Sequence, residues 1–157
     1  MDDIDRFRSI MAHVRKSIRD NIKTTITGLT TVGTNVFQSR VYPVAAPKLP
    51  CMMLYSKDES IDYHSIGSPR LQERTVNFTI EIFVRGSSGY DDQIDQICLE
   101  VEEALYTDLS RGGNAIETKI SNFDADFNGE GDQPVGIATL TVEVRYQVRE
   151  NNPDVAI

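Results

Sequence analysis

Two stretches of strict alternation between apolar and polar residues constrain the fold of this chain more than any other feature. They span Arg74–Arg85 and Ile137–Val148, and apolar side chains occupy every second position of each. Successive side chains on a β-strand point to opposite faces, so each stretch predicts a long strand with one apolar and one polar face. The apolar positions are Val76, Phe78, Ile80, Ile82 and Val84, then Ala138, Leu140, Val142, Val144, Tyr146 and Val148.

Two amphipathic helices are available to cover the apolar face. Residues 4–27 carry apolar side chains at helical spacing, and Gly28 marks the expected end. A second helix is predicted from Asp91 to about Leu109, with acidic residues at its start, where the helix dipole favours negative charge. Its expected apolar stripe consists of Ile94, Ile97, Cys98, Val101, Leu105 and Leu109.

The remaining segments predict shorter strands and one long loop. Strands are expected at Asn35–Val41, Cys51–Lys57 and Glu117–Phe127. The segment Asp58–Gln72 is polar and is expected to be a loop, and loops of this length are usually either mobile or functional. The order of elements predicts an α+β fold, with a mainly antiparallel sheet of about five strands and both helices packed on one face.

The length of 157 residues suits a single domain with a substantial core. We place that domain at residues 1–149 and expect a flexible tail at 150–157. No apolar run approaches the roughly 20 residues that cross a bilayer. The N-terminus is acidic and unlike a signal peptide, so we expect a cytoplasm-like compartment.

The formal net charge of −8 is unevenly distributed along the chain. Residues 1–28 carry a net +2 and residues 29–85 a net +1, whereas residues 86–157 have four basic and fifteen acidic side chains. Such a chain is a poor candidate for sequence-specific nucleic-acid binding. Two interpretations remain open: copies pair head to tail through complementary patches, or the charges only keep the protein soluble.

Candidate chemistry is sparse. The run Asp124-x-Asp126-x-Asn128-Gly129 matches the first half of a calcium loop, but Val135 stands where a bidentate Glu is needed. His13 and His64 have no ligand partner at suitable spacing. We therefore expect no catalytic, metal or cofactor site. The alternative is a small metal-dependent enzyme that uses these aspartates or the second helix's carboxylates, Asp91, Asp92, Asp95, Glu100, Glu102 and Glu103.

The two cysteines, Cys51 and Cys98, do not form a CxxC motif. We expect buried, reduced thiols that behave as small apolar side chains. A disulfide between them remains possible, because one lies in a predicted strand and the other on a predicted helical stripe.

Seven residues are candidates for contact with a partner. Tyr63 and Arg70 lie in the predicted long loop, and Tyr and Arg are favoured at interface hot spots. The charged residues on the long strands are expected either to form cross-strand ion pairs or to contact a partner. They are Arg74, Glu81, Arg85, Glu143 and Arg145.

The layout of the chain resembles the tail terminator proteins, also called tail completion or minor tail proteins, of long-tailed bacteriophages and related prophages. The resemblance covers most of the chain and is one of order and spacing. It rests on the N-terminal amphipathic helix, Arg40-Val41-Tyr42-Pro43, Leu49-Pro50 before a strand ending in Tyr55, the strand Phe78–Ile82, the helix Asp91–Leu109 and the closing strand Ala138–Tyr146.

The resemblance implies a structural protein of the virion tail or neck, assembled in the bacterial host cytoplasm. Such a protein forms a homo-oligomeric ring, commonly a hexamer, that caps the tail tube protein, ends its polymerisation and joins it to the head connector. DNA would pass through the lumen, and an acidic lumen would let it slide. The segment Asp58–Gln72 would contact the tube or the connector. A head-closure or other neck protein is the related alternative.

Overall fold

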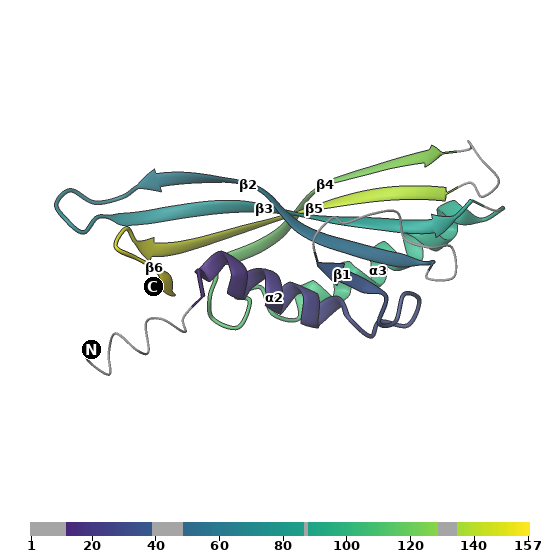
Figure 1. The fold of residues 1–157 in the computed structure, drawn as a ribbon, viewed down its shortest axis with the longest axis horizontal. Coiled ribbons are helices and arrows are strands. Elements are labelled where there is room, and N and C mark those ends of the chain that lie inside the picture. Colours follow the sequence, from purple (N-terminus) through teal and green to yellow (C-terminus); the bar gives the residue numbers. More distant parts are fainter. Residues whose placement is uncertain (1–11, 39–48, 87, 129–134) are drawn as a thin grey trace.

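The computed structural model describes residues 12–38, 49–86, 88–128 and 135–157, and these form an α+β fold (Figure 1). Six strands make one sheet in the order β1-β2-β3-β5-β4, with β6 pairing to β5. Only the β1–β2 pair is parallel, so the predicted fold class is confirmed, with six strands in place of about five. The elements are α2 Val14–Ile26, β1 Val36–Gln38, β2 Cys51–Tyr63, β3 Leu71–Arg85, α3 Tyr90–Tyr106, β4 Glu117–Asn128, β5 Val135–Arg149 and β6 Asn152–Ala156.

The two alternating stretches form the central pair of strands. β3 and β5 run antiparallel from Leu71 opposite Arg149 to Arg85 opposite Val135. This register places apolar residues opposite apolar residues, for example Phe78 opposite Val142. All the predicted apolar positions of both strands are buried, which confirms the pattern. We call this side of the sheet the inner face and the opposite side the outer face.

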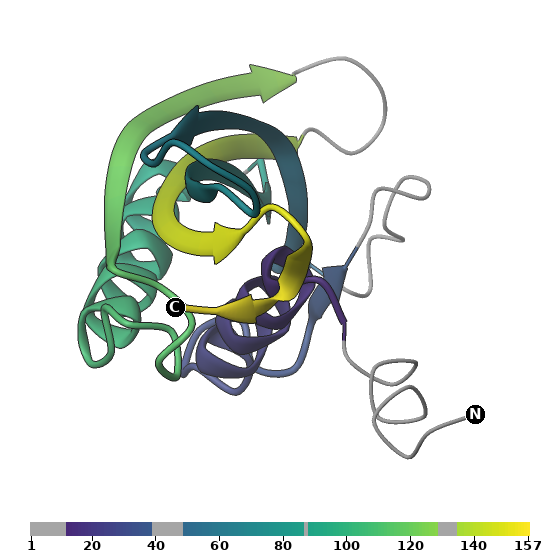
Figure 2. The same cartoon turned by 90° about the vertical axis from the view of Figure 1, so that its left-hand side faces the viewer.

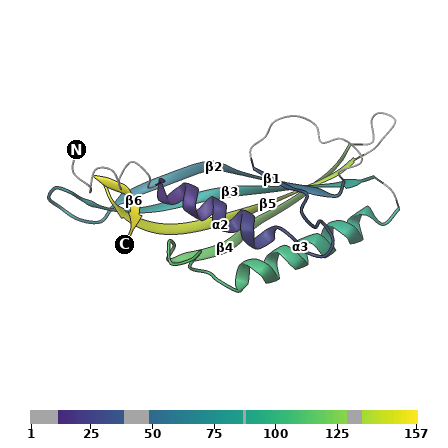
Figure 3. The same cartoon turned by 60° about the horizontal axis from the view of Figure 1, so that its bottom comes forward.

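Both helices pack against the inner face (Figures 2 and 3). Figure 2 shows the sheet curling over them, so that one core is enclosed between the two layers. Each helix buries one apolar stripe at helical spacing, as expected. The stripes are Val14, Ile18, Ile22 and Ile26 on α2, and Ile94, Ile97, Cys98, Val101 and Leu105 on α3. The part of the first predicted helix before residue 12 lies outside the described residues.

The predicted loop Asp58–Gln72 is wrong for most of its length. β2 continues to Tyr63 and β3 begins at Leu71, so only residues 64–70 connect the two strands of a long hairpin. Polar cross-strand contacts hold the outer part of this hairpin, such as Asn77 Nδ2 donating to Asp58 Oδ1 at 2.6 Å. The apolar alternation that predicts strands is absent there because residues 57–63 are largely exposed, and a bulge between Ser56 and Asp58 also shifts the register.

The C-terminal residues also differ from the expectation of a flexible tail at 150–157. Asn152–Ala156 forms β6, which pairs with the end of β5, and the Ile157 N–H donates to the Gln147 carbonyl at 3.0 Å. The turn between β5 and β6 therefore returns the chain toward α2, as Figure 2 shows. The domain boundary at residue 149 remains a prediction.

A buried arginine closes the C-terminal end of α3, which ends at Tyr106 rather than at Leu109. Arg111 has a φ of 50° and no exposed surface. Its guanidinium donates to the carbonyls of Leu105 and Asp108, and to Asn21 Oδ1 of α2 at 3.2 Å. Helix C-terminal carbonyls carry partial negative charge, so they compensate the buried cation. Burial lowers the pKa of Arg111.

Replacing Arg111 with Met should lower the free energy of unfolding by about 2–4 kcal/mol, because the buried carbonyls lose charge-assisted hydrogen bonds. Urea denaturation followed by circular dichroism measures the change. The matched control is Lys57→Met, at an exposed position, which should stay within about 0.5 kcal/mol of wild type. Equal stability of the Arg111 variant and wild type would contradict the role assigned to this side chain.

Candidate functional site

The outer face of the sheet carries a network of cross-strand ion pairs. Arg145 on β5 lies 3.3 Å from Glu73 on β3 and 3.4 Å from Glu117 on β4. Lys119 on β4 pairs with Glu143 on β5 at 3.3 Å. These partners lie on three neighbouring strands, so the network crosses β3, β5 and β4 on the outer face. Each pair is partly exposed and contributes little stability by itself.

Four of the seven predicted contact residues lie on the outer face, namely Glu81, Arg85, Glu143 and Arg145, but Glu81 is buried within the subunit (9% exposed). The hydroxyl of Tyr55 donates to Glu81 Oε1 at 2.6 Å across β2 and β3. Cross-strand pairs therefore do form. Period two places the charged side chains on one face but does not say which strands are neighbours, so the partners could not be named from the sequence.

The turn of the β2–β3 hairpin is held by side-chain contacts. We call residues 64–70 the hairpin tip. The Arg70 guanidinium carbon lies 4.2 Å from the centre of the Tyr63 ring, and its Nε donates to Glu150 Oε2 at 3.0 Å. Arg70 and Glu150 also share two backbone contacts of 3.0 Å, and hydrogen bonds from Arg70 lower the pKa of Glu150.

Ile66 stands at the apex of this tip, and its side chain is completely exposed (104%). Below it, the Leu71 N–H donates to Ser65 Oγ at 2.7 Å. The two predicted loop residues, Tyr63 and Arg70, are thus brought together, and what they support is a fixed apolar knob. Figure 1 shows the hairpin reaching one end of the molecule, with no helix over its tip.

Arg74, the seventh predicted contact residue, lies on the inner face in a buried charged cluster. It is 8% exposed, and its Nη1 donates to Glu59 Oε2 at 3.1 Å. Arg15 from α2 approaches the same carboxylate at 3.3 Å, and the Tyr146 hydroxyl donates to its other oxygen. Arg74 has the same parity as Val76, so the alternation already indicated its inward direction. Glu59 faces inward only because of the β2 bulge, for which the sequence carries no clear signal.

His13 joins this cluster as the N-cap of α2. Its Nδ1 accepts the Arg15 backbone N–H at 3.0 Å, and its Nε2 lies 3.2 Å from Arg15 Nη2 and 3.3 Å from Arg74 Nη1. Burial, then the charges of Arg15 and Arg74, lower the pKa of His13, whereas Glu59 and Asp154 act in the opposite direction. The pKa of Tyr146 is raised, by burial and by the adjacent Glu59.

The cysteines are separate, buried thiols. Cys51 is opposite Phe83 on the outer face, whereas Cys98 belongs to the core on the inner face, and both are free. Because they lie on different sides of the sheet, the possible disulfide is not formed. Burial raises the pKa of each thiol to about 11.

The calcium-like run lies on an edge strand. Asp124 and Asp126 are in β4, opposite Thr139 and Ile137, and Gly129 lies outside the described residues. Within the described ranges, no group of three or more His, Cys, Asp or Glu side chains is placed to hold a metal ion. None of the helices in those ranges is long and apolar enough to cross a membrane.

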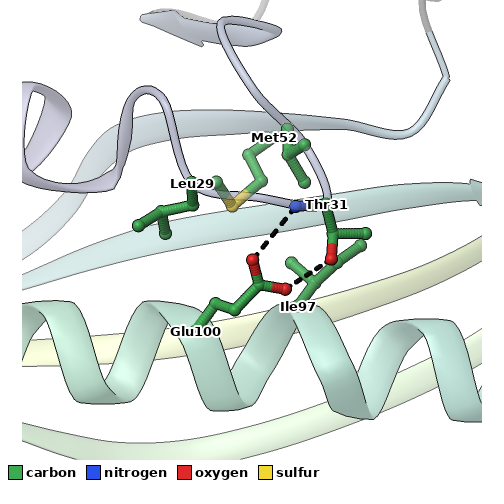
Figure 4. Close-up of a pocket in the computed structure, with 6 residues that line it drawn as sticks. Leu29, Thr31, Met52, Ile97 and Glu100 are labelled. Carbon is green, nitrogen blue, oxygen red and sulfur yellow. Dashed lines mark hydrogen bonds between the residues drawn. The ribbon is translucent and has the colours of Figure 1, made fainter.

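The carboxylate of Glu100 connects α3 to the segment that follows α2. Glu100 accepts the backbone N–H of Thr31 at 3.0 Å and also the Thr31 hydroxyl, which docks the segment after α2 onto α3 (Figure 4). The hydrogen bonds from Thr31 lower the pKa of Glu100. The surrounding pocket leaves no room for a water molecule, so it is a packing contact. A second hollow, of about 260 Å³, lies between the end of α3 and the start of β4.

Comparisons with known proteins leave the family open. No family model matches the chain, and no curated protein matches it. Among solved structures, a similar chain belongs to the "Virion of native gene transfer agent (GTA) particle", with 14% identity and a TM-score of 0.41, covering 87% of this chain and 94% of that one. A likeness at this level carries no inference about function.

Protonation of His13 should destabilise the protein at acidic pH. The folded-state pKa of His13 lies below the ordinary histidine value of about 6.5, so the stability that neutral His13 contributes is complete above that pH and is lost as the pH falls through the folded-state pKa. His13→Asn keeps a good N-cap and cannot titrate, so this variant should lose less stability between about pH 7 and pH 5. Urea denaturation over that range measures it. His64→Asn is the control, and identical pH profiles for His13→Asn and wild type would contradict the proposal.

Proposed function

We propose that this chain is a structural component of a phage-like virion, a tail terminator that assembles as a ring on the end of the tail tube and joins it to the head connector. The observation that carries the proposal is the asymmetric covering of the sheet: α2 and α3 pack on the inner face, whereas charged pairs cross β3, β5 and β4 on the outer face. Where β2 meets β3, the outer face is also buried within the subunit, at Cys51, Met53, Thr79 and Glu81. The order of elements that resembles this family is consistent with the fold.

The outer face has the properties of a surface made for protein partners. Its charges are arranged across three strands rather than around a cavity, and the residues of β5 that face outward are partly exposed along its whole length. Polar surfaces of this kind give specificity and orientation more than raw affinity. That suits copies that have to meet in a single register.

The helix layer supports head-to-tail association. α2 carries four basic residues and one acidic residue, whereas α3 carries six acidic residues and no basic one. The two helices are neighbours on the inner face, so surfaces of opposite charge lie at different flanks of one subunit. A heterologous contact between such flanks closes into a ring when the rotation between copies permits it. The resemblance favours six copies.

Removal of the gene from the source phage or prophage should yield tails of abnormal and variable length without heads, because nothing stops polymerisation of the tube. Electron microscopy of lysates measures tail length. If the chain is instead a head-closure protein, tails should keep their normal length and remain detached from heads. Particles of normal appearance would contradict both functions.

The hairpin tip should be dispensable for folding and necessary for assembly. Replacing residues 65–69 with two glycines removes no core residue, so the thermal midpoint should change by only a few degrees. The same variant, supplied in trans to the deletion strain, should fail to restore tails of normal length. Leu99→Gln, an exposed change on α3, is the control and should restore them. Full restoration by the tip variant would contradict a role of the hairpin in assembly.

A further inference from the structure

The hollow between α3 and β4 is an open apolar groove. Its lining consists of Leu105, Tyr106, Leu109 and Ile120, together with Glu102, Thr118 and Lys119. Tyr106 is 76% exposed and Leu109 is 40% exposed. The volume of about 260 Å³ is enough for one or two aliphatic side chains. We call this feature the α3–β4 groove.

Apolar surface continues past the groove along β4. A register shift between Ile120 and Asn122 places Phe123 on the inner face, opposite Leu140, one step beyond Ile120 opposite Val142. Phe123 is 48% exposed. Large apolar side chains that stay half exposed side by side usually mark an interaction surface.

The hairpin tip has the complementary shape. Ile66 is its most exposed side chain, and the contacts of Arg70 with Tyr63 and Glu150 fix the backbone beneath it. A knob that is already ordered loses little conformational entropy on binding. The most exposed large apolar side chain of the described residues thus lies on a turn whose two ends are held by hydrogen bonds.

The charges of the two features are complementary. Glu102 lines the groove on a helix that has no basic residue, and Lys119, which also lines the groove, is paired with Glu143 at 3.3 Å. Residues 64–70 contain one arginine and one histidine but no carboxylate. Arg70 donates through Nε to Glu150, and a guanidinium has five N–H donors in all. The remaining donors of Arg70 can therefore also contact the carboxylate of Glu102 in the groove of another copy.

The tip and the groove are formed by different elements of one chain: the hairpin tip is at one end of the molecule (Figure 1), and the groove is lined by the C-terminal end of α3 and the start of β4. We propose that Ile66 of one copy inserts into the α3–β4 groove of the next copy. The contact is heterologous, so each copy gives one knob and receives another, as ring closure requires. This inference rests on the proposed ring-forming function and names its subunit contact.

Two single variants test the contact. Ile66→Glu removes the knob, and Tyr106→Glu places a second acidic charge in the groove; both side chains are exposed, so the fold should be kept. Each variant should weaken self-association at least about 30-fold, as expected for a hot spot, in analytical ultracentrifugation. The control is Val155→Glu on β6, which should assemble like wild type.

Mixing the variants gives a sharper result. An Ile66→Glu copy keeps its groove and a Tyr106→Glu copy keeps its knob, so the mixture should form a 1:1 pair and nothing larger. Absence of that pair would overturn the proposed contact. Assembly of Ile66→Glu alone, with wild-type affinity, would also overturn it, whereas ring formation and the tail-length phenotype would remain as evidence for the proposed function.

Cysteine trapping covers the case in which wild type is monomeric in isolation. Ile66→Cys mixed with Tyr106→Cys under mild oxidation should give a disulfide-linked dimer, because the proposed contact brings the two new thiols together. The native Cys51 and Cys98 should not interfere, because they are buried, have pKa values of about 11 and react slowly. Val155→Cys mixed with Tyr106→Cys should give at least about tenfold less dimer. Equal yields from the two mixtures would overturn the inference.

Discussion

The pairing of β3 with β5 is the interaction on which the rest of the structure depends. Both strands are 15 residues long and they pair from end to end without a bulge. Their strict alternation therefore gives one continuous apolar face, and a shift of one residue would turn every apolar side chain toward solvent. Helices α2 and α3 cover that face, which leaves the outward residues of β5 partly exposed on the opposite face.

At the ends of this core, charged side chains connect the two helices to each other and to the sheet. Arg111 joins the end of α3 to Asn21 of α2, and Glu59 joins Arg15 of α2 to Arg74 of β3. Breaking a buried pair leaves an uncompensated charge, so such groups enforce one arrangement of helices on the sheet. The hairpin that extends past the helices can then keep a fixed direction.

Periodicity predicted the elements whose side chains fill the core. The long strands, the helical stripes and the fold class follow from side chains that repeat every two or every 3.6 residues. The outer hairpin and β6 were missed because polar contacts and backbone pairing hold them, as Asp58 with Asn77 shows. Hydropathy carries no signal for such contacts.

For the same reason, the sequence predicted the direction of some residues of the candidate site and not of others. Alternation places Glu81 and Arg145 on the outer face, and by the same parity it places Arg74 on the inner one. The inward direction of Glu59 depends on one bulge, and the burial of Arg111 on a positive φ after a helix end. The groove beside α3 joins residues of two elements, so only the folded chain reveals it.

Cryo-electron microscopy of the assembled protein, alone or on tail tubes, would show which face of the sheet meets other subunits. We expect a closed ring in which the outer face, with Glu143 and Arg145, lies against sister copies or the lumen, while α2 and α3 keep their places on the inner face of each subunit. An assembly whose outer face is open to bulk solvent on the outside of the particle would contradict this expectation.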